Sequence, residues 1–155
     1  MASPRADKLP GTVVPSLIAL AVLLLHLTCL TQYGVFRDEF YYLDCSRHLA
    51  WGYVDHPPFS IAVLAALRGI FGQSLAVVRL PVVLIHGAIV LLVGDLVQRR
   101  GGGRFAQALA CLATSLAPVY LSGMHYYSMN AFDVLLWTAA ASLLVRLLPS
   151  PTLSG

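Results

Sequence analysis

Charged residues are scarce in this chain of 155 residues: they make up 11% of it, whereas hydrophobic residues make up 58%. Soluble domains carry roughly 25% charged residues. This deficit, together with a mean hydropathy of +0.77, indicates a membrane protein. The basic residues are scattered or lie at the ends of apolar runs, so we expect no nucleic-acid-binding face.

Cysteine is also sparse, with three residues in the chain: Cys29, Cys45 and Cys111. Cys29 and Cys111 fall inside apolar runs, where free cysteine behaves as a small hydrophobic residue. Cys45 has no obvious partner, so the sequence predicts no disulfide framework.

Four apolar runs approach the length of about 20 residues that a helix needs to cross a bilayer. Their charges lie near the ends, as expected when a charge at mid-bilayer costs about 2.5–3.5 kcal/mol. A fifth run, Phe59 to Gly72, follows two prolines and is too short to cross, so we expect it to lie at the interface. We predict an all-α, polytopic membrane protein with juxtamembrane helices on its outer surface. Its predicted spans are residues 13–30, 75–97, 105–122 and 131–148.

The basic residues predict the orientation, because cytoplasmic loops are enriched in lysine and arginine. A cytoplasmic tail at residues 1–12 places six of them on that side. The outer loop at residues 32–74 then faces outward, as does the short link at 123–133, and residues 149–155 form a tail or the edge of a longer chain. The six residues are Arg5, Lys8, Arg99, Arg100, Arg104 and Arg146.

The outer loop gathers four of the seven carboxylates of the chain. After Phe36 the sequence is helical in character, and we predict Asp38 as its N-cap and Gly52 as its end. On this helix Asp38 shares a face with Tyr42. The four carboxylates are Asp38, Glu39, Asp44 and Asp55.

Asp133 lies at the outer mouth of the fourth span, so acids from two loops can converge at the outer leaflet. A carboxylate at that depth can take a proton from an acceptor hydroxyl, and a second can bind a divalent ion. A phosphate leaving group could be bound by His56, Arg37 or Arg68. Each acid also has a purely structural explanation: Asp38 and Asp133 as helix caps, Asp55 as a turn residue.

Four stretches resemble, in the same order, the N-terminal part of glycosyltransferases of the GT-C fold that use lipid-phosphate sugars. They are similar to protein O-mannosyltransferases and to the aminoarabinose transferase of lipid A. The acid pair lies in "FRDEFYYL", and "DHPPF" has a histidine where the family commonly has lysine. The stretches are "FRDEFYYL", "DHPPF", "RLPVVLIHGAIVLLVGDLVQRRGGGRFAQALA" and "SMNAFDVLLW".

The resemblance implies transfer of a sugar from a polyprenyl-phosphate donor to a hydroxyl of a lipid, glycan or protein acceptor. Asp38 would be the general base, with Glu39 beside it at the catalytic site to support or position it, and Asp133 would be a second catalytic acid. Asp55 is a candidate ligand for a divalent metal ion, the one cofactor implied. Substrate and phosphate contacts would come from His56, Tyr42 and Arg37.

Family members are several hundred residues long and have many more spans. We therefore expect this chain to be the amino-terminal part of such an enzyme, possessing the acids but lacking further spans. The implied location is the plasma (inner) membrane, with a cytoplasmic N-terminus and the acid-rich loop outside.

Two other function classes fit the composition. His26 and His86 lie inside predicted spans and would serve a haem- or quinone-binding protein, although a neutral histidine bonded to a neighbouring helix explains each more simply. The other class is a transporter or assembly subunit without chemistry, in which the outer acids would be dispensable.

Overall fold

The computed structural model describes residues 11–148 and contains, over that range, seven helices and no strand. The predicted all-α class is therefore confirmed. The predictions that concern Arg5, Lys8 and residues 149–155 lie outside the described residues. The helices are α1 (Val13–Cys29), α2 (Arg37–Cys45), α3 (Phe59–Phe71), α4 (Leu75–Arg99), α5 (Arg104–Leu116), α6 (Pro118–Gly123) and α7 (Met129–Leu147).

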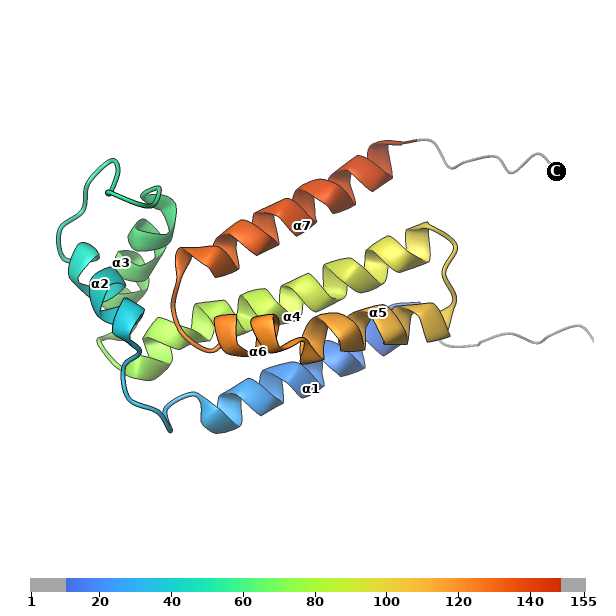
Figure 1. The fold of residues 1–155 in the computed structure, drawn as a ribbon, viewed down its shortest axis with the longest axis horizontal. Coiled ribbons are helices and arrows are strands. Elements are labelled where there is room, and N and C mark those ends of the chain that lie inside the picture. Colours follow the sequence, from blue (N-terminus) through green and yellow to red (C-terminus); the bar gives the residue numbers. More distant parts are fainter. Residues whose placement is uncertain (1–10, 149–155) are drawn as a thin grey trace, which may run out of the picture.

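The long helices run side by side, and α4 lies at the centre, packed against α1, α5 and α7 (Figure 1). The short helices α2 and α3 gather at one end of this bundle, where the link between α6 and α7 also lies. The turn between α4 and α5 and both ends of the described chain lie at the opposite end. The two acid-bearing loops thus share one end, as the sequence predicts.

Three of the four predicted spans correspond to continuous helices, namely α1, α4 and α7. Of the described helices, α4 and α7 are long and apolar enough to cross a membrane, while α1 and α3 are apolar but shorter. The predicted span at 105–122 is instead two helices, α5 and α6. They part at Ala117, whose ψ of 130° is extended, because the residue before Pro118 is sterically disfavoured from the helical region.

The helix predicted in the outer loop is shorter than expected and begins earlier. Its N-cap is Phe36 rather than Asp38, and the backbone N–H of Phe36 donates to the Glu39 carboxylate at 2.8 Å. It ends at Cys45 rather than near Gly52. The Tyr53 hydroxyl holds the chain in a turn there, because it donates to the carbonyl of His48 (3.0 Å) and accepts from the N–H of Ala50 (3.1 Å).

The helix predicted at the interface is α3, with Pro58 as its N-cap. Its inner face packs on α2 and α4 and buries Ile61 and Leu64 completely. At its C-terminal end Ile70 and Phe71 are 72% and 67% exposed. This amphipathic arrangement suits a helix that rests on a membrane surface.

The contact between α1 and α4 depends on glycine at position 94. A Cβ there would lie 2.2 Å from Cγ of Pro15 and 3.3 Å from Sγ of Cys111. The buried amide of Gln107 fastens α5 to the same region, donating to the carbonyls of Gly11 (3.0 Å) and Gly94 (3.1 Å). All three cysteines are free, and Cys111 is fully buried as expected.

At the end opposite the acid-rich loops, Asp95 joins α4 to α7. Its carboxylate accepts from Arg99 at 2.8 Å and from Arg146 at 3.0 Å. The pairing with Arg99 follows from their spacing of four residues along a helix, whereas the bond to Arg146 depends on the packing of the bundle.

Candidate functional site

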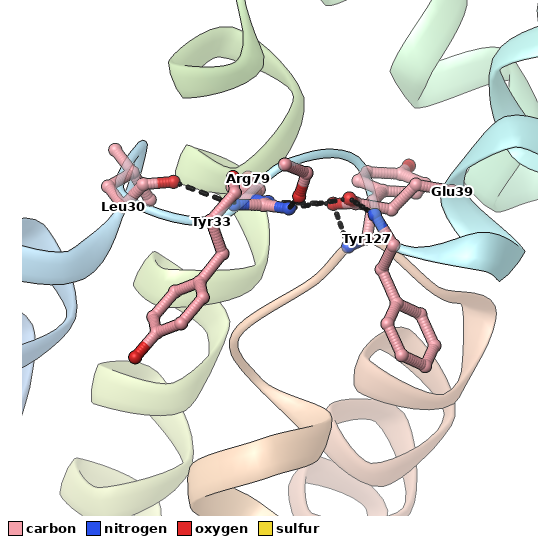
Figure 2. Close-up of polar contacts among 7 residues, drawn as sticks. Leu30, Tyr33, Glu39, Arg79 and Tyr127 are labelled. Carbon is pink, nitrogen blue, oxygen red and sulfur yellow. Dashed lines mark hydrogen bonds and ion pairs between the residues drawn. The ribbon is translucent and has the colours of Figure 1, made fainter.

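A buried ion pair between Glu39 and Arg79 organises the end of the bundle that carries the acids (Figure 2). Arg79 is in the second turn of α4, and its Nη2 and Nε lie 2.7 and 2.9 Å from the two carboxylate oxygens of Glu39. The side chains of Arg79 and Glu39 are 1% and 0% exposed. A buried pair of this kind is tolerated only when its remaining hydrogen-bonding groups are also satisfied.

Those groups are satisfied by two other segments, the connection between α1 and α2 and the link between α6 and α7. The guanidinium donates to the carbonyls of Leu30 (2.9 Å) and Gly34 (2.8 Å), which follow α1, and the Glu39 carboxylate accepts from the N–H of Tyr127 at 3.0 Å. Burial alone would raise the pKa of Glu39, but the bonds from Arg79 and from the N–H groups of Phe36 and Tyr127 outweigh it and lower that pKa.

Each Glu39 oxygen already accepts two hydrogen bonds, so this carboxylate is held as a structural anchor beside Asp38. The sequence analysis did not connect Arg79 with the site. A signal was present, because an ionisable residue inside an apolar run calls for a buried partner.

Asp38 lies next to this anchor and, unlike Glu39, reaches solvent, with 43% of its side chain exposed. One of its oxygens accepts from Nε of Arg37 at 3.0 Å. Arg37 itself is 89% exposed, so its pairing with Asp38 is a surface interaction of modest strength. Asp38 therefore keeps accepting capacity for a substrate hydroxyl.

Tyr42 is the buried residue around which two of the acids are arranged. It lies one turn after Asp38, on the predicted shared face, and is buried. Its pKa is raised, first by burial and then by the negative charges of Asp55 and Asp38.

Asp55 and Asp133 line one cleft of about 380 Å³, between the start of α3 and the start of α7. The Tyr41 hydroxyl donates to Asp55 at 2.8 Å, and this bond is the main reason that the pKa of Tyr41 is raised. Ser60 also lines the cleft, and its buried hydroxyl has no partner among the described residues. The cleft therefore presents two exposed carboxylates and an unused hydroxyl.

Asp133 is not a helix cap, since α7 begins at Met129 with Ser128 as its N-cap. Asp133 therefore lines the cleft without capping α7. The cap interpretation of Asp38 and of Asp133 is therefore wrong for both residues.

His56 lies among tyrosine rings, is 6% exposed and does not line the cleft. Its ring stacks on Tyr42 with centroids 5.2 Å apart and lies 4.9 Å from that of Tyr53. Nε2 of His56 is buried and has no hydrogen-bond partner among the described residues. In this position the ring supports the neighbouring tyrosines, and a phosphate could reach it only after they move.

Arg68 is remote from the cleft. It is eight residues after Ser60 on α3, about 12 Å along a helix axis. The predicted residues that the structure brings together are thus Asp55 and Asp133, whereas Asp38 lies at the same end of the bundle and does not line their cleft.

No group of three or more metal-ligating side chains occurs within residues 11–148. Asp55 and Asp133 nevertheless offer oxygen ligands on one cleft, beside the amide of Asn130. Magnesium is commonly held by one or two carboxylates together with substrate phosphates. The cleft fits this pattern, because it offers two carboxylates to a magnesium ion that also binds a phosphate.

The two histidines in the apolar helices contact each other directly. Nε2 of His26 and Nδ1 of His86 are 2.9 Å apart, which confirms the expected bond between neighbouring helices. A bis-histidine haem holds its iron between the two rings, so this contact disfavours haem binding by this pair. His125 stacks on His26 with centroids 6.0 Å apart, and these two line an apolar cavity of about 770 Å³.

A family model described as dolichyl-phosphate-mannose-protein mannosyltransferase matches residues 55–154. The matched range includes Asp55, Arg79 and Asp133, whereas Asp38 and Glu39 precede it. No curated protein and no solved structure matches the chain.

Proposed function

Because the chain belongs to the dolichyl-phosphate-mannose-protein mannosyltransferase family, we propose that it transfers a sugar from a polyprenyl-phosphate donor to an acceptor hydroxyl. The observation that best supports this proposal is the arrangement of Asp38, Asp55 and Asp133. Asp55 and Asp133 come from separate segments and line a single cleft, and Asp38, on α2, lies at the same end of the bundle. A merely solvated acidic surface would not require such convergence.

In the proposed reaction Asp38 is the general base. It takes the proton of the acceptor hydroxyl while that oxygen attacks the anomeric carbon of the sugar. The bond between the anomeric carbon and the phosphate oxygen breaks, and its electron pair leaves with the polyprenyl phosphate. Attack from the side opposite the leaving group inverts the configuration at that carbon.

Glu39 and Arg79 have a positioning role in this proposal. Their ion pair holds the first turn of α2, and hence Asp38, against α4 and the segment before α7. Asp55 and Asp133 orient the substrates at the cleft, and Tyr41 orients Asp55 through its hydrogen bond. A divalent cation, where one is used, would be held by Asp55 and Asp133 and would supply charge stabilisation for the leaving phosphate.

The proposal extends to the sugar, the acceptor and the location of the reaction. We assign the sugar as mannose and the acceptor as a protein hydroxyl, in keeping with the family description. The reaction would take place at the outer face of the plasma membrane, with Arg99, Arg100 and Arg146 on the cytoplasmic side.

Asp38→Asn tests the proposal, with Asp44→Asn as the matched control on the same helix. Asp44 is 73% exposed, and among the described residues its carboxylate pairs with His48 alone, so its loss should leave transfer unchanged. Membranes containing the protein are supplied with polyprenyl-phosphate mannose, and transfer to an acceptor peptide is measured. We expect Asp38→Asn to lower the rate by about 10²–10⁴-fold at equal expression. Near wild-type transfer by that variant would exclude Asp38 as the base.

A further inference from the structure

A second polar cavity, of about 490 Å³, lies between the C-terminal ends of α2 and α3. It is distinct from the cleft with Asp55 and Asp133 and shares no lining residue with it. Two arginines, Arg47 and Arg68, line it, together with the polar side chains of Ser46 and Gln73.

Three hydrogen bonds hold Arg68 in this cavity, and its guanidinium retains unused N–H donors. It is 8% exposed, and it donates to the carbonyl of Leu43 at 2.9 Å, to the Ser46 hydroxyl and to the Gln73 amide oxygen. A guanidinium has five N–H donors, of which these bonds use three. Its Nε is buried and has no partner among the described residues.

No carboxylate neutralises the two arginines. Neither Arg47 nor Arg68 forms an ion pair within the described part of the chain. The pKa of Arg68 is lowered, first by burial and then by the positive charge of Arg47, so the two cations oppose each other. A buried cation without a counter-ion is costly, which makes the cavity complementary to an anion.

The position of the cavity indicates the source of that anion. The same end of α3 exposes Ile70 and Phe71, and apolar side chains on an interfacial helix insert at the boundary between headgroups and acyl chains. Arg68, two residues before Ile70, then lies at the depth of the lipid phosphates. We propose that this cavity binds the phosphate of an anionic phospholipid of the outer leaflet, through the guanidinium groups of Arg47 and Arg68.

Planar guanidinium groups suit this ligand, because they bind phosphate oxygens through paired hydrogen bonds. A phosphate here would meet the remaining N–H of Arg68 Nη2 and the exposed guanidinium of Arg47. It would also fasten the end of α3 to the membrane. The inference does not depend on the proposed sugar transfer, because the cavity and the catalytic acids share no residue.

The test is native mass spectrometry of the purified chain, titrated with phosphatidylglycerol or with diacylglycerol of the same acyl chains. These two lipids differ in the phosphate-bearing headgroup. We expect phosphatidylglycerol to bind and diacylglycerol not to bind. Arg47→Gln should weaken phosphatidylglycerol binding about fivefold, the contribution of one arginine near a charged lipid surface. Arg100→Gln removes the same charge at the C-terminal end of α4, which lies at the opposite end of the bundle, and should leave binding unchanged.

Arg47 is exposed, and its side chain forms no hydrogen bond or ion pair with another residue in the range 11–148, so its variant should remain folded. Arg68→Gln should abolish binding, and its melting temperature shows whether the chain is intact. Equal phosphatidylglycerol affinity of the wild type and Arg47→Gln would overturn the proposal. So would displacement of the lipid by equimolar inorganic phosphate, which would assign the cavity to a free anion. Sugar transfer by Arg47→Gln should stay at the wild-type rate, which separates this inference from the catalytic one.

Discussion

Removing one partner of the pair between Glu39 and Arg79 should destabilise the end of the bundle that carries the acids. Arg79→Met leaves the Glu39 carboxylate, which is 0% exposed, with two backbone N–H donors and no counter-charge. It also leaves the carbonyls of Leu30 and Gly34 without their donor. Breaking a buried ion pair in this way costs about 3–5 kcal/mol.

In a chain of 155 residues each kcal/mol lowers the melting temperature by about 2–4 °C, so we expect a loss of about 6–20 °C. The assay is thermal unfolding of the detergent-solubilised protein, followed by circular dichroism. Glu39→Gln should destabilise by a similar amount, because an amide cannot reproduce the four bonds that the carboxylate accepts. The double variant should be less destabilised than the sum of the two single variants, since no uncompensated charge remains.

The same pair predicts the direction of the pH dependence of stability. Its bonds lower the pKa of Glu39 below the ordinary value of 4.5. A carboxylate with a lowered pKa in the folded state contributes stability that is fully present above the unfolded pKa and is lost as pH falls through the folded pKa. The wild type should therefore lose stability below about pH 4.5, and Glu39→Gln should lose less. Single variants that melt within about 1 °C of the wild type, or strictly additive effects, would refute the assigned role of the pair.

Three further outcomes follow from other parts of the structure. Gly94→Val should lower the free energy of unfolding by about 1–3 kcal/mol, because its Cβ would overlap Pro15. The control is Gly69→Ala, which should not destabilise the protein, because no atom lies within 4 Å of the added Cβ. Denaturant titration measures both free energies. Tyr41→Phe should slow sugar transfer about fivefold by releasing Asp55, while Tyr33→Phe should not; equal rates would remove Tyr41 from the site. Removing divalent ions with a chelator should lower the rate of sugar transfer, and added magnesium should restore it. Magnesium should restore less activity in Asp55→Asn than in the wild type. A rate unchanged by the chelator would exclude a role for a metal ion.

The sequence was sufficient to predict the helical class and most helix positions, because long apolar runs with charges at their ends have few other solutions. The break within residues 105–122 was not predicted, although the sequence contains its signal, since Pro118 lies inside that run. The residue at which α2 ends could not be predicted from the sequence. It depends on the Tyr53 hydroxyl, which reaches back over the turn, and a contact of this kind has no periodic signature.

For the site, the sequence identified the acids but not their distinct environments. Asp38 and Glu39 are neighbours in sequence, yet one side chain is 43% exposed and the other is 0% exposed. The difference is set by Arg79, 40 residues away, whose position opposite Glu39 follows only from the packing of α4 against the outer segments. His56 likewise matched a motif position, but the tyrosines from α2 and the following loop enclose it.

The roles proposed for the paired acids agree with their different environments. A base must reach solvent and substrate, so it cannot also satisfy the buried donors that hold a loop against the bundle. Glu39 accepts from Arg79 and from the N–H groups of Phe36 and Tyr127, and thereby joins four segments at one point. Asp38, one residue before it, is displaced by about 100° around the helix and faces outward. Glu39 thus determines the position of Asp38, and exchanging the two residues would bury the proposed base and expose the residue that binds Arg79.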